Sequence, residues 1–211
     1  MNHHYRIAIV DSGAGGAYLE QLIKERFSTE IITQIVRYQP ELFQSYSNIS
    51  LQKLCILCQE HVDYICQDFI PDIIIVACMT LSSNCLEFIK SIVPDNVIVL
   101  DMITCLPYLH NNTTIFGTPN TINSGRFSYC VEIPCAKLST VIEEDNLDHI
   151  IKLEILNAVN KLNLTVTSTI LLGCSHYSIV KNLFQELFNP VEIIDPLELI
   201  LEKLKYIVEP W

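Results

Sequence analysis

The stretch that decides the fold of this chain is TILLGCSHY, which runs from Thr169 to Tyr177. A short Ile/Leu run that ends at Gly173 is typical of a strand buried on both faces. The apolar residues that follow recur with helical spacing. We therefore place Cys174 at the end of a strand, on the turn that opens a helix. Free backbone N–H groups and the helix dipole favour a negative charge there, so a thiol would ionise more easily.

A second stretch repeats this construction about half a chain length earlier. Ile73 to Thr80 reads IIIVACMT, an apolar run with Cys78 and a hydroxyl near its end, and a helix-patterned segment follows it. A lone free cysteine usually serves as a small buried hydrophobe. Two matched units instead indicate two similar α/β lobes that face each other, each with a functional cysteine at a strand end.

The N-terminal part carries a glycine-rich turn. A strand over Tyr5–Val10 leads directly into DSGAGG at Asp11–Gly16, and a helix follows. Such a turn is an anion-binding shape, but it lacks the G-x-G-x-x-G spacing of dinucleotide sites. Asp11 disfavours a phosphate at this position. It is interpreted as a hydrogen-bonding or proton-handling group, with helix capping as the alternative.

The rest of the chain alternates between strand-like and helix-like segments. Strands are expected at 31–38, 96–101, 113–116, 135–141 and 191–194, and helices at 51–70, 121–129, 147–162 and 196–208, with a loop at 39–50. This alternation favours an α/β fold with mainly parallel sheets flanked by helices. Binding is then expected at the carboxyl ends of the strands, where the turns described above lie.

Composition restricts the class of protein. The chain has 211 residues, 50% hydrophobic residues and a net charge of −11, which excludes binding to nucleic-acid phosphates. No apolar stretch has membrane-spanning length, and the N-terminus lacks a signal-peptide pattern. Nine scattered cysteines then indicate a cytoplasmic protein with reduced thiols. Cys55 and Cys58 form a C-x-x-C without a second pair, a weak indication of zinc or redox use.

The turns suggest a chemistry when taken together. They carry two thiols, a carboxylate, an imidazole and several small hydroxyls, but no Lys or Arg. A small anionic substrate would be held by backbone N–H groups and hydroxyls, and no Lys stands out as a partner for pyridoxal phosphate. Two thiols across one cleft suit removal of a proton from a carbon and its return on the opposite face.

Five motifs then carry a resemblance that covers the chain from end to end. They are DSGAGG (11–16), ACMT (77–80), GTPNTINSG (117–125), LLGCSHY (171–177) and IIDP (193–196). In this order they resemble the cofactor-independent aspartate/glutamate racemase superfamily, and His176 resembles its glutamate-specific members. The resemblance implies two pseudo-symmetric lobes with the active site between them, formed by residues 1–101 plus 196–211 and by residues 102–195. It also implies interconversion of L- and D-glutamate, which supplies D-glutamate for peptidoglycan, without a cofactor or metal and in a homodimer.

The same resemblance assigns roles to individual residues. Cys78 and Cys174 would act as acid and base on opposite faces of the α-carbon. Asp11 would assist Cys78, His176 would assist Cys174, and Glu143 would be a further acidic catalytic residue. The residues that would hold the substrate carry hydroxyl groups: Ser12, Thr80, Thr118, Thr121 and Ser175.

Two departures from the family pattern keep alternatives open. Met79 follows the first cysteine where the family has Asn, and residues 36–47 lack the family's G-D-x-x-x-x-P-Y-G segment, although Tyr46 could replace its aromatic residue. One alternative is a racemase for aspartate or another small amino acid, and a second is a non-catalytic racemase-like binding protein. A thiol hydrolase using Cys174 and His176 lacks an evident orienting group.

Overall fold

The computed structural model describes residues 4–38, 45–159 and 167–209, which form two four-stranded parallel sheets. The first sheet has the order β2-β1-β3-β4, and the second has the order β6-β5-β7-β8. The strands of the first are β1 (Tyr5–Val10), β2 (Ile32–Tyr38), β3 (Ile73–Val76) and β4 (Ile98–Asp101). Those of the second are β5 (Thr113–Gly117), β6 (Val131–Pro134), β7 (Thr169–Gly173) and β8 (Glu192–Ile194). The predicted α/β fold with parallel sheets is confirmed.

The two sheets are built alike. In each, the first strand in sequence lies inside and pairs with the second strand on one side and the third on the other. Strand β3 therefore occupies the same place in the first sheet as β7 does in the second. All of β3 and nearly all of β7 are buried, as expected for parallel strands covered on both faces.

Nine α-helices are present among the described residues. They are α1 (Ala14–Arg26), α2 (Leu51–Tyr64), α3 (Met79–Ile92), α4 (Pro119–Asn123), α5 (Leu138–Glu143), α6 (Asp148–Val159), α7 (Ser175–Ile179), α8 (Lys181–Phe188) and α9 (Pro196–Val208). A 3₁₀ turn (Tyr46–Asn48) precedes α2, and a π-helical turn (Ile65–Phe69) extends it. In the described part of the chain, no helix is both long enough and apolar enough to cross a membrane.

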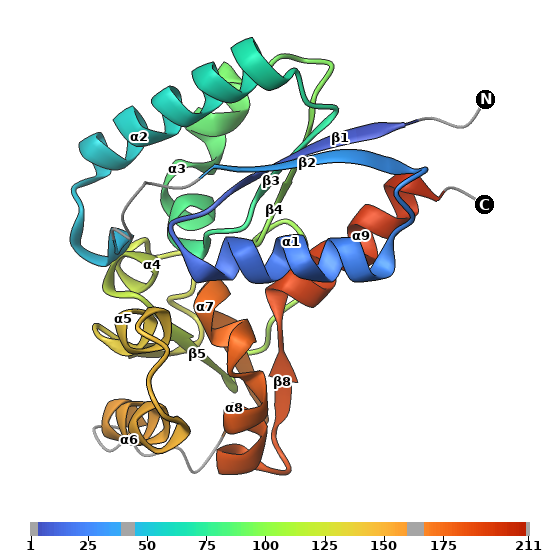
Figure 1. Cartoon of the computed structure of the whole chain (residues 1–211). Coiled ribbons are helices and arrows are strands. Elements are labelled where there is room, and N and C mark those ends of the chain that lie inside the picture. The colour runs from blue at the N-terminus through green and yellow to red at the C-terminus, as the bar shows by residue number, and fades with distance from the viewer. Residues whose placement is uncertain (1–3, 39–44, 160–166, 210–211) are drawn as a thin grey trace.

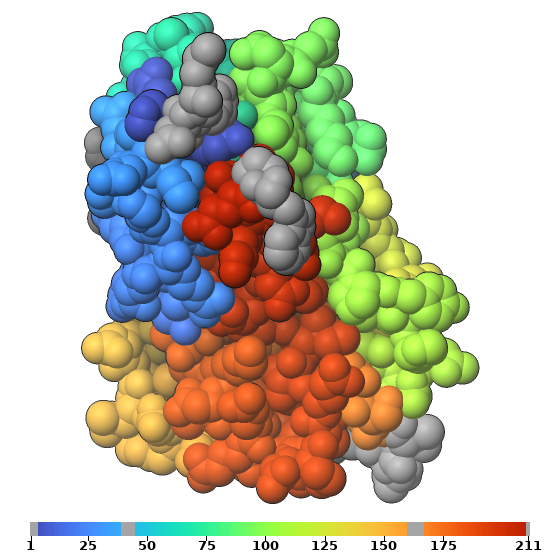
Figure 2. All heavy atoms as spheres, turned by 90° about the vertical axis from the view of Figure 1, so that its right-hand side faces the viewer, coloured from blue at the N-terminus to red at the C-terminus, as the bar shows by residue number. Residues whose placement is uncertain are grey.

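One apolar core joins the two sheets. Helices α1 and α9 lie side by side across the middle of the molecule (Figure 1), and an ion pair links Arg26 of α1 to Glu198 of α9. The buried residues of these helices form one cluster with Ile115 of β5 and Leu171 of β7. Helices α2 and α3 cover the opposite face of the first sheet through a second cluster. In the side view, the red atoms of the C-terminal part lie between the blue atoms of the N-terminal part and the green atoms of the middle of the chain (Figure 2).

Three predicted elements differ from the structure. The expected helix at 121–129 is the shorter α4, because Thr118 caps its start, Pro119 occupies its first turn and Gly125 adopts a positive φ of 73° just after it. The expected strand at 135–141 is wrong. Strand β6 comes earlier and buries Ile133, while α5 occupies 138–143 although its β-branched residues favour a strand, so packing outweighs propensity there.

The expected helix after Cys174 is divided at Val180 into α7 and α8. Residues 39–44 of the predicted loop lie outside the described residues. So do residues 160–162 of the predicted helix at 147–162.

Candidate active site

The two matched cysteines occupy equivalent positions in the two sheets. Cys78 follows β3 and is the N-cap residue of α3, and Cys174 follows β7 and is the N-cap residue of α7. Both thiols are buried. They lie within electrostatic reach of each other, since the charge of Cys174 contributes to the raised pKa of Cys78. The structure thus brings together the two cysteines that the sequence placed at separate strand ends.

Asp11 is a fully buried carboxylate between the two halves of the chain. Its Oδ2 accepts a 2.6 Å hydrogen bond from the N–H of Gly16, and its Oδ1 accepts one of 3.1 Å from the hydroxyl of Ser175. Burial raises the pKa of Asp11, while the positive charge of His176 and these hydrogen bonds oppose the rise. Burial and then the charge of Asp11 raise the pKa of Cys78 well above its ordinary value.

His176 and Glu143 form an ion pair beside Cys174. The Nε2 of His176 donates to Oε2 of Glu143 at 2.6 Å, and its Nδ1 lies 3.8 Å from the sulfur of Cys174. Burial disfavours the charged imidazole, but the hydrogen bonds with Cys174 and Glu143 outweigh it and raise the pKa of His176 to about 10. The hydrogen bond from His176 lowers the pKa of Glu143. A positive charge therefore lies next to Cys174 at neutral pH.

Glu143 also connects the two halves of the molecule. It ends α5, and its Oε2 accepts a 2.8 Å hydrogen bond from the backbone N–H of Ala14 at the start of α1. Helix α1 also approaches α7 closely at this place. A Cβ on Gly15 would lie 2.8 Å from the backbone carbonyl carbon of Ser175 and closer still to its side chain. Glycine at position 15 is therefore required for the two halves to meet at the site.

Three threonine hydroxyls form a buried triangle between the halves. The hydroxyl of Thr80, in the first turn of α3, lies 2.9 Å from that of Thr118 and 3.3 Å from that of Thr121, and the last two are 3.0 Å apart. Thr118 follows β5, the strand that corresponds to β1 in the first sheet. Ser12 lies next to Asp11 and is also buried. The predicted hydroxyl-bearing residues thus line the same junction as the two thiols.

Tyr46 belongs to this junction, although the sequence indicated it only as a replacement for a family aromatic residue. Its side chain is 2% exposed, and its hydroxyl has no hydrogen-bond partner among the described residues. Burial raises its pKa, and the nearby charges of Cys78 and Asp11 add to the rise. Asn120 of α4 fixes this segment by donating to the carbonyl of Tyr46 at 2.7 Å. An unpartnered buried hydroxyl next to Cys78 is a donor that a ligand in the junction can use.

Met79 lies in the shared apolar core, not in the polar junction. It is 1% exposed and packs in the cluster that joins the two sheets. The side chain of Met79 therefore packs in the core, and it offers no hydrogen-bonding group to the site.

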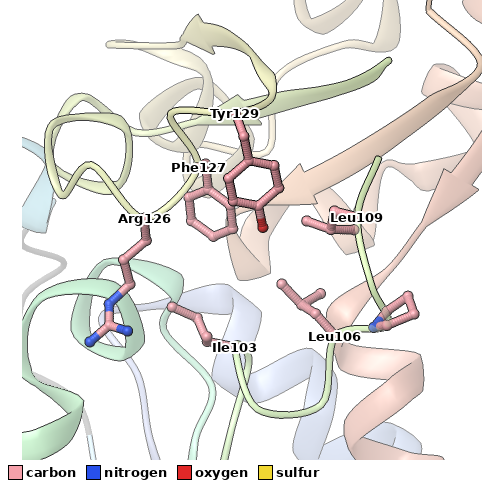
Figure 3. Close-up of a pocket in the computed structure, with 7 residues that line it drawn as sticks. Ile103, Leu106, Leu109, Arg126, Phe127 and Tyr129 are labelled. Carbon is pink, nitrogen blue, oxygen red and sulfur yellow. The ribbon is translucent and has the colours of Figure 1, made fainter. Parts of the chain in front are cut away.

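A separate pocket of about 360 Å³ lies beside the connection between the sheets (Figure 3). Ile103, Leu106, Phe127 and Tyr129 give it a largely apolar wall, and none of the predicted site residues lines it. Arg126 at its edge extends towards α3, where its Nε donates to the carbonyl of Ser83 at 2.7 Å. This pocket is distinct from the polar junction around the thiols.

Comparison with known proteins agrees with the motif order. No protein-family model matches the sequence. The glutamate racemase of Syntrophus aciditrophicus is 25% identical over 210 residues, which cover 91% of this chain and 76% of that protein. The structure of glutamate racemase isoform RacE1 from Bacillus anthracis matches with a TM-score of 0.82 and 22% identity, over 99% of this chain and 83% of that one. The structure of a Francisella tularensis glutamate racemase in complex with D-glutamate matches with a TM-score of 0.80 and 22% identity, over 98% of this chain and 81% of that one. The predicted resemblance to glutamate racemases is confirmed.

Proposed function

We propose that this protein is a glutamate racemase, an isomerase that inverts the α-carbon of glutamate without a cofactor. The observation that carries this proposal is the pair Cys78 and Cys174, buried at equivalent strand ends and within electrostatic reach of each other. Inversion at carbon needs a base on one face and an acid on the other, and two thiols can exchange these roles according to which enantiomer is bound.

In the proposed mechanism, one sulfur takes the α-proton as the other gives a proton to the opposite face. For one enantiomer Cys78 is the thiolate and Cys174 the thiol, and for the other enantiomer the roles are reversed. Asp11 can accept and return the proton of Cys78, since burial raises its pKa above that of an exposed carboxyl group. His176 can stabilise the thiolate form of Cys174 with its positive charge.

The hydroxyl groups supply the proposed substrate contacts. Thr80, Thr118 and Thr121 satisfy one another in the closed arrangement and can turn to carboxylate oxygens when a ligand enters. The start of α3 adds backbone N–H groups and a favourable dipole for such a group. Because the thiols and these hydroxyls are buried, we propose that the two lobes separate to admit the substrate and then close.

Several finer points stay predictions that this proposal includes. They are the supply of D-glutamate for peptidoglycan, the cytoplasmic location, the homodimer and the division into lobes at 1–101 plus 196–211 and at 102–195. A second candidate, a racemase for aspartate or another small amino acid, is favoured by one observation. Met79 stands where the family pattern has Asn and lies in the core, so the side-chain amide contact that Asn would offer the substrate is absent at this position.

The experiment that tests the proposal is proton NMR of the purified protein with L-glutamate in heavy water. We expect loss of the α-proton signal together with formation of D-glutamate, with no cofactor added. The same measurement with aspartate and other amino acids separates the two candidates. If no amino acid in the panel exchanges its α-proton, the proposal of a racemase is wrong and a binding role replaces it.

A further inference from the structure

Three cysteines outside the proposed active site meet at the packed interface of α2 and α3. The sulfur of Cys55 in α2 lies 4.0 Å from the sulfur of Cys85 in α3. Cys58, one turn after Cys55, is also near enough to Cys85 to contribute to the raised pKa of that thiol. Cys58 and Cys85 are buried in the core under α2 and α3, whereas Cys55 is partly exposed. The third cysteine of this cluster, next to the C-x-x-C of α2, thus lies on a different helix, α3.

We propose that Cys55 and Cys85 are a modification site, where oxidation by a hydroperoxide forms a disulfide that ties α2 to α3. The two sulfurs need to move about 2 Å closer to reach the bond length of a disulfide, which is close to 2.05 Å. Each cysteine belongs to a regular helix, and the two helices already pack against each other. Rotation of the two side chains is the movement that would close this gap.

The reaction balances with the hydroperoxide as the only oxidant. The thiolate of Cys55 attacks the O–O bond, so a sulfenic acid forms and an alcohol, or water from hydrogen peroxide, leaves with the thiol proton. The sulfur of Cys85 then attacks this sulfenic sulfur. The S–S bond forms, the S–O bond breaks, and water leaves with the proton of Cys85. Cys55 is the first to react because it is the cluster's partly exposed thiol.

Cys58 gives the cluster a second pairing through thiol–disulfide exchange. Its sulfur can attack Cys85 in the oxidised pair, which forms a Cys58–Cys85 bond and releases Cys55 as a thiol. Both disulfides would join the same two helices. Helix α3 begins next to Cys78, and α2 follows the segment of Tyr46, so the bond would tie together two elements that carry residues of the junction. The formation of the bond does not depend on the proposed racemase activity.

The test is to map disulfides in the full chain after treatment with limiting hydrogen peroxide. No Lys or Arg lies between Lys53 and Lys90, so trypsin would leave all the relevant cysteines on one peptide. Cleavage after Glu60 and Asp72 instead separates Cys55 and Cys58 from Cys85. After alkylation of the remaining thiols, we expect mass spectrometry to find a peptide that joins Cys55 to Cys85 and that disappears on reduction. Activity is not the readout, because Cys78 and Cys174 are thiols themselves.

Matched variants make the result specific. Cys66→Ser is the control, since Cys66 follows on the same helical segment and is also half-buried, with a pKa raised by burial and by Asp63. It should leave the cross-link unchanged, whereas Cys55→Ser should abolish it or transfer it to Cys58. The proposal is overturned if, in the wild-type chain, Cys55 joins Cys58, or if no disulfide joins α2 to α3 while Cys66 is oxidised.

Discussion

The two halves of the molecule present the same backbone but opposite charges to their cysteines. Cys78 and Cys174 each follow the third strand of a four-stranded sheet and open a helix. Beside Cys78 lies the buried carboxylate of Asp11, whereas beside Cys174 lies the imidazole of His176, whose pKa is raised to about 10. A repeated fold therefore positions the two thiols alike, and side chains that differ between the two halves decide the charge that each one faces.

Each charge is also held by a group from the opposite half. Ser175, after β7, donates to Asp11, after β1, and the backbone N–H of Ala14 in α1 donates to Glu143 in α5. These crossing hydrogen bonds form only when the two halves are together. The closed molecule therefore gives each of these two carboxylates a hydrogen bond that the separate halves lack.

The largest effect should come from removal of either thiol. We expect Cys78→Ala and Cys174→Ala each to lower kcat/KM for racemisation by more than about 1000-fold, as for the loss of an essential acid or base. L- and D-glutamate have equal free energies in water, so both directions must lose the same factor. The measurement is circular dichroism of glutamate solutions, started from each enantiomer in turn. A variant that kept a tenth of the wild-type rate would contradict the two-thiol comparison.

The neighbours of the thiols should have smaller effects that fall on kcat. We expect Asp11→Asn and His176→Gln each to lower kcat by about 100-fold, because the charge of Asp11 acts on Cys78 and His176 lies beside the sulfur of Cys174. The pH profile distinguishes them from residues with a purely structural role. Asp11→Asn should shift the pH profile of kcat in the direction in which Cys78 takes the α-proton. His176→Gln should shift it in the direction in which Cys174 takes the α-proton.

Primary isotope effects with α-deuterated glutamate check this assignment. The isotope effect on kcat should change for one enantiomer in one variant and for the other enantiomer in the second variant. Identical changes in both variants would mean that the charges beside the thiols act together and not on separate halves.

A smaller loss should follow from keeping the two halves apart. Gly15→Ala adds a methyl group that would contact the backbone of Ser175 below 3.0 Å, so α1 and α7 must separate. Displacement of catalytic groups by about 1 Å typically costs about 100-fold in rate, and partial relaxation should bring the loss nearer to about tenfold. The control is Gly125→Ala. A Cβ at this position would meet no atom of the described residues within 4 Å, so the positive φ of 73° would be its one source of strain. Steady-state kinetics should show a loss for Gly15→Ala and near-normal rates for Gly125→Ala.

The sequence predicts the features that the two halves of the molecule share better than the contacts in which they differ. The strand–Cys–helix units at Cys78 and Cys174 are local patterns, so their positions at strand ends follow from periodicity and burial. The contacts of Glu143 do not follow in this way, because α5 appears as a β-prone segment and its position depends on packing against the second sheet. The burial of Tyr46 beside Cys78 likewise depends on Asn120, which is distant in sequence.

The smallest expected effect concerns stability, and it tests whether His176 and Glu143 form a charged pair. The pKa of His176 is raised from 6.5 to about 10, so its contribution is complete below pH 6.5 and is lost as the pH rises to about 10. The pKa of Glu143 is lowered, so its contribution is present above about pH 4.5 and is lost at lower pH.

Glu143→Gln should therefore reduce the free energy of unfolding by about 2 kcal/mol near neutral pH. Urea denaturation of both proteins should show this difference shrinking towards pH 10 and again below pH 4. A difference that stayed constant from neutral pH to pH 10 would mean that no proton leaves the pair in this range, which contradicts a pKa of about 10 for His176.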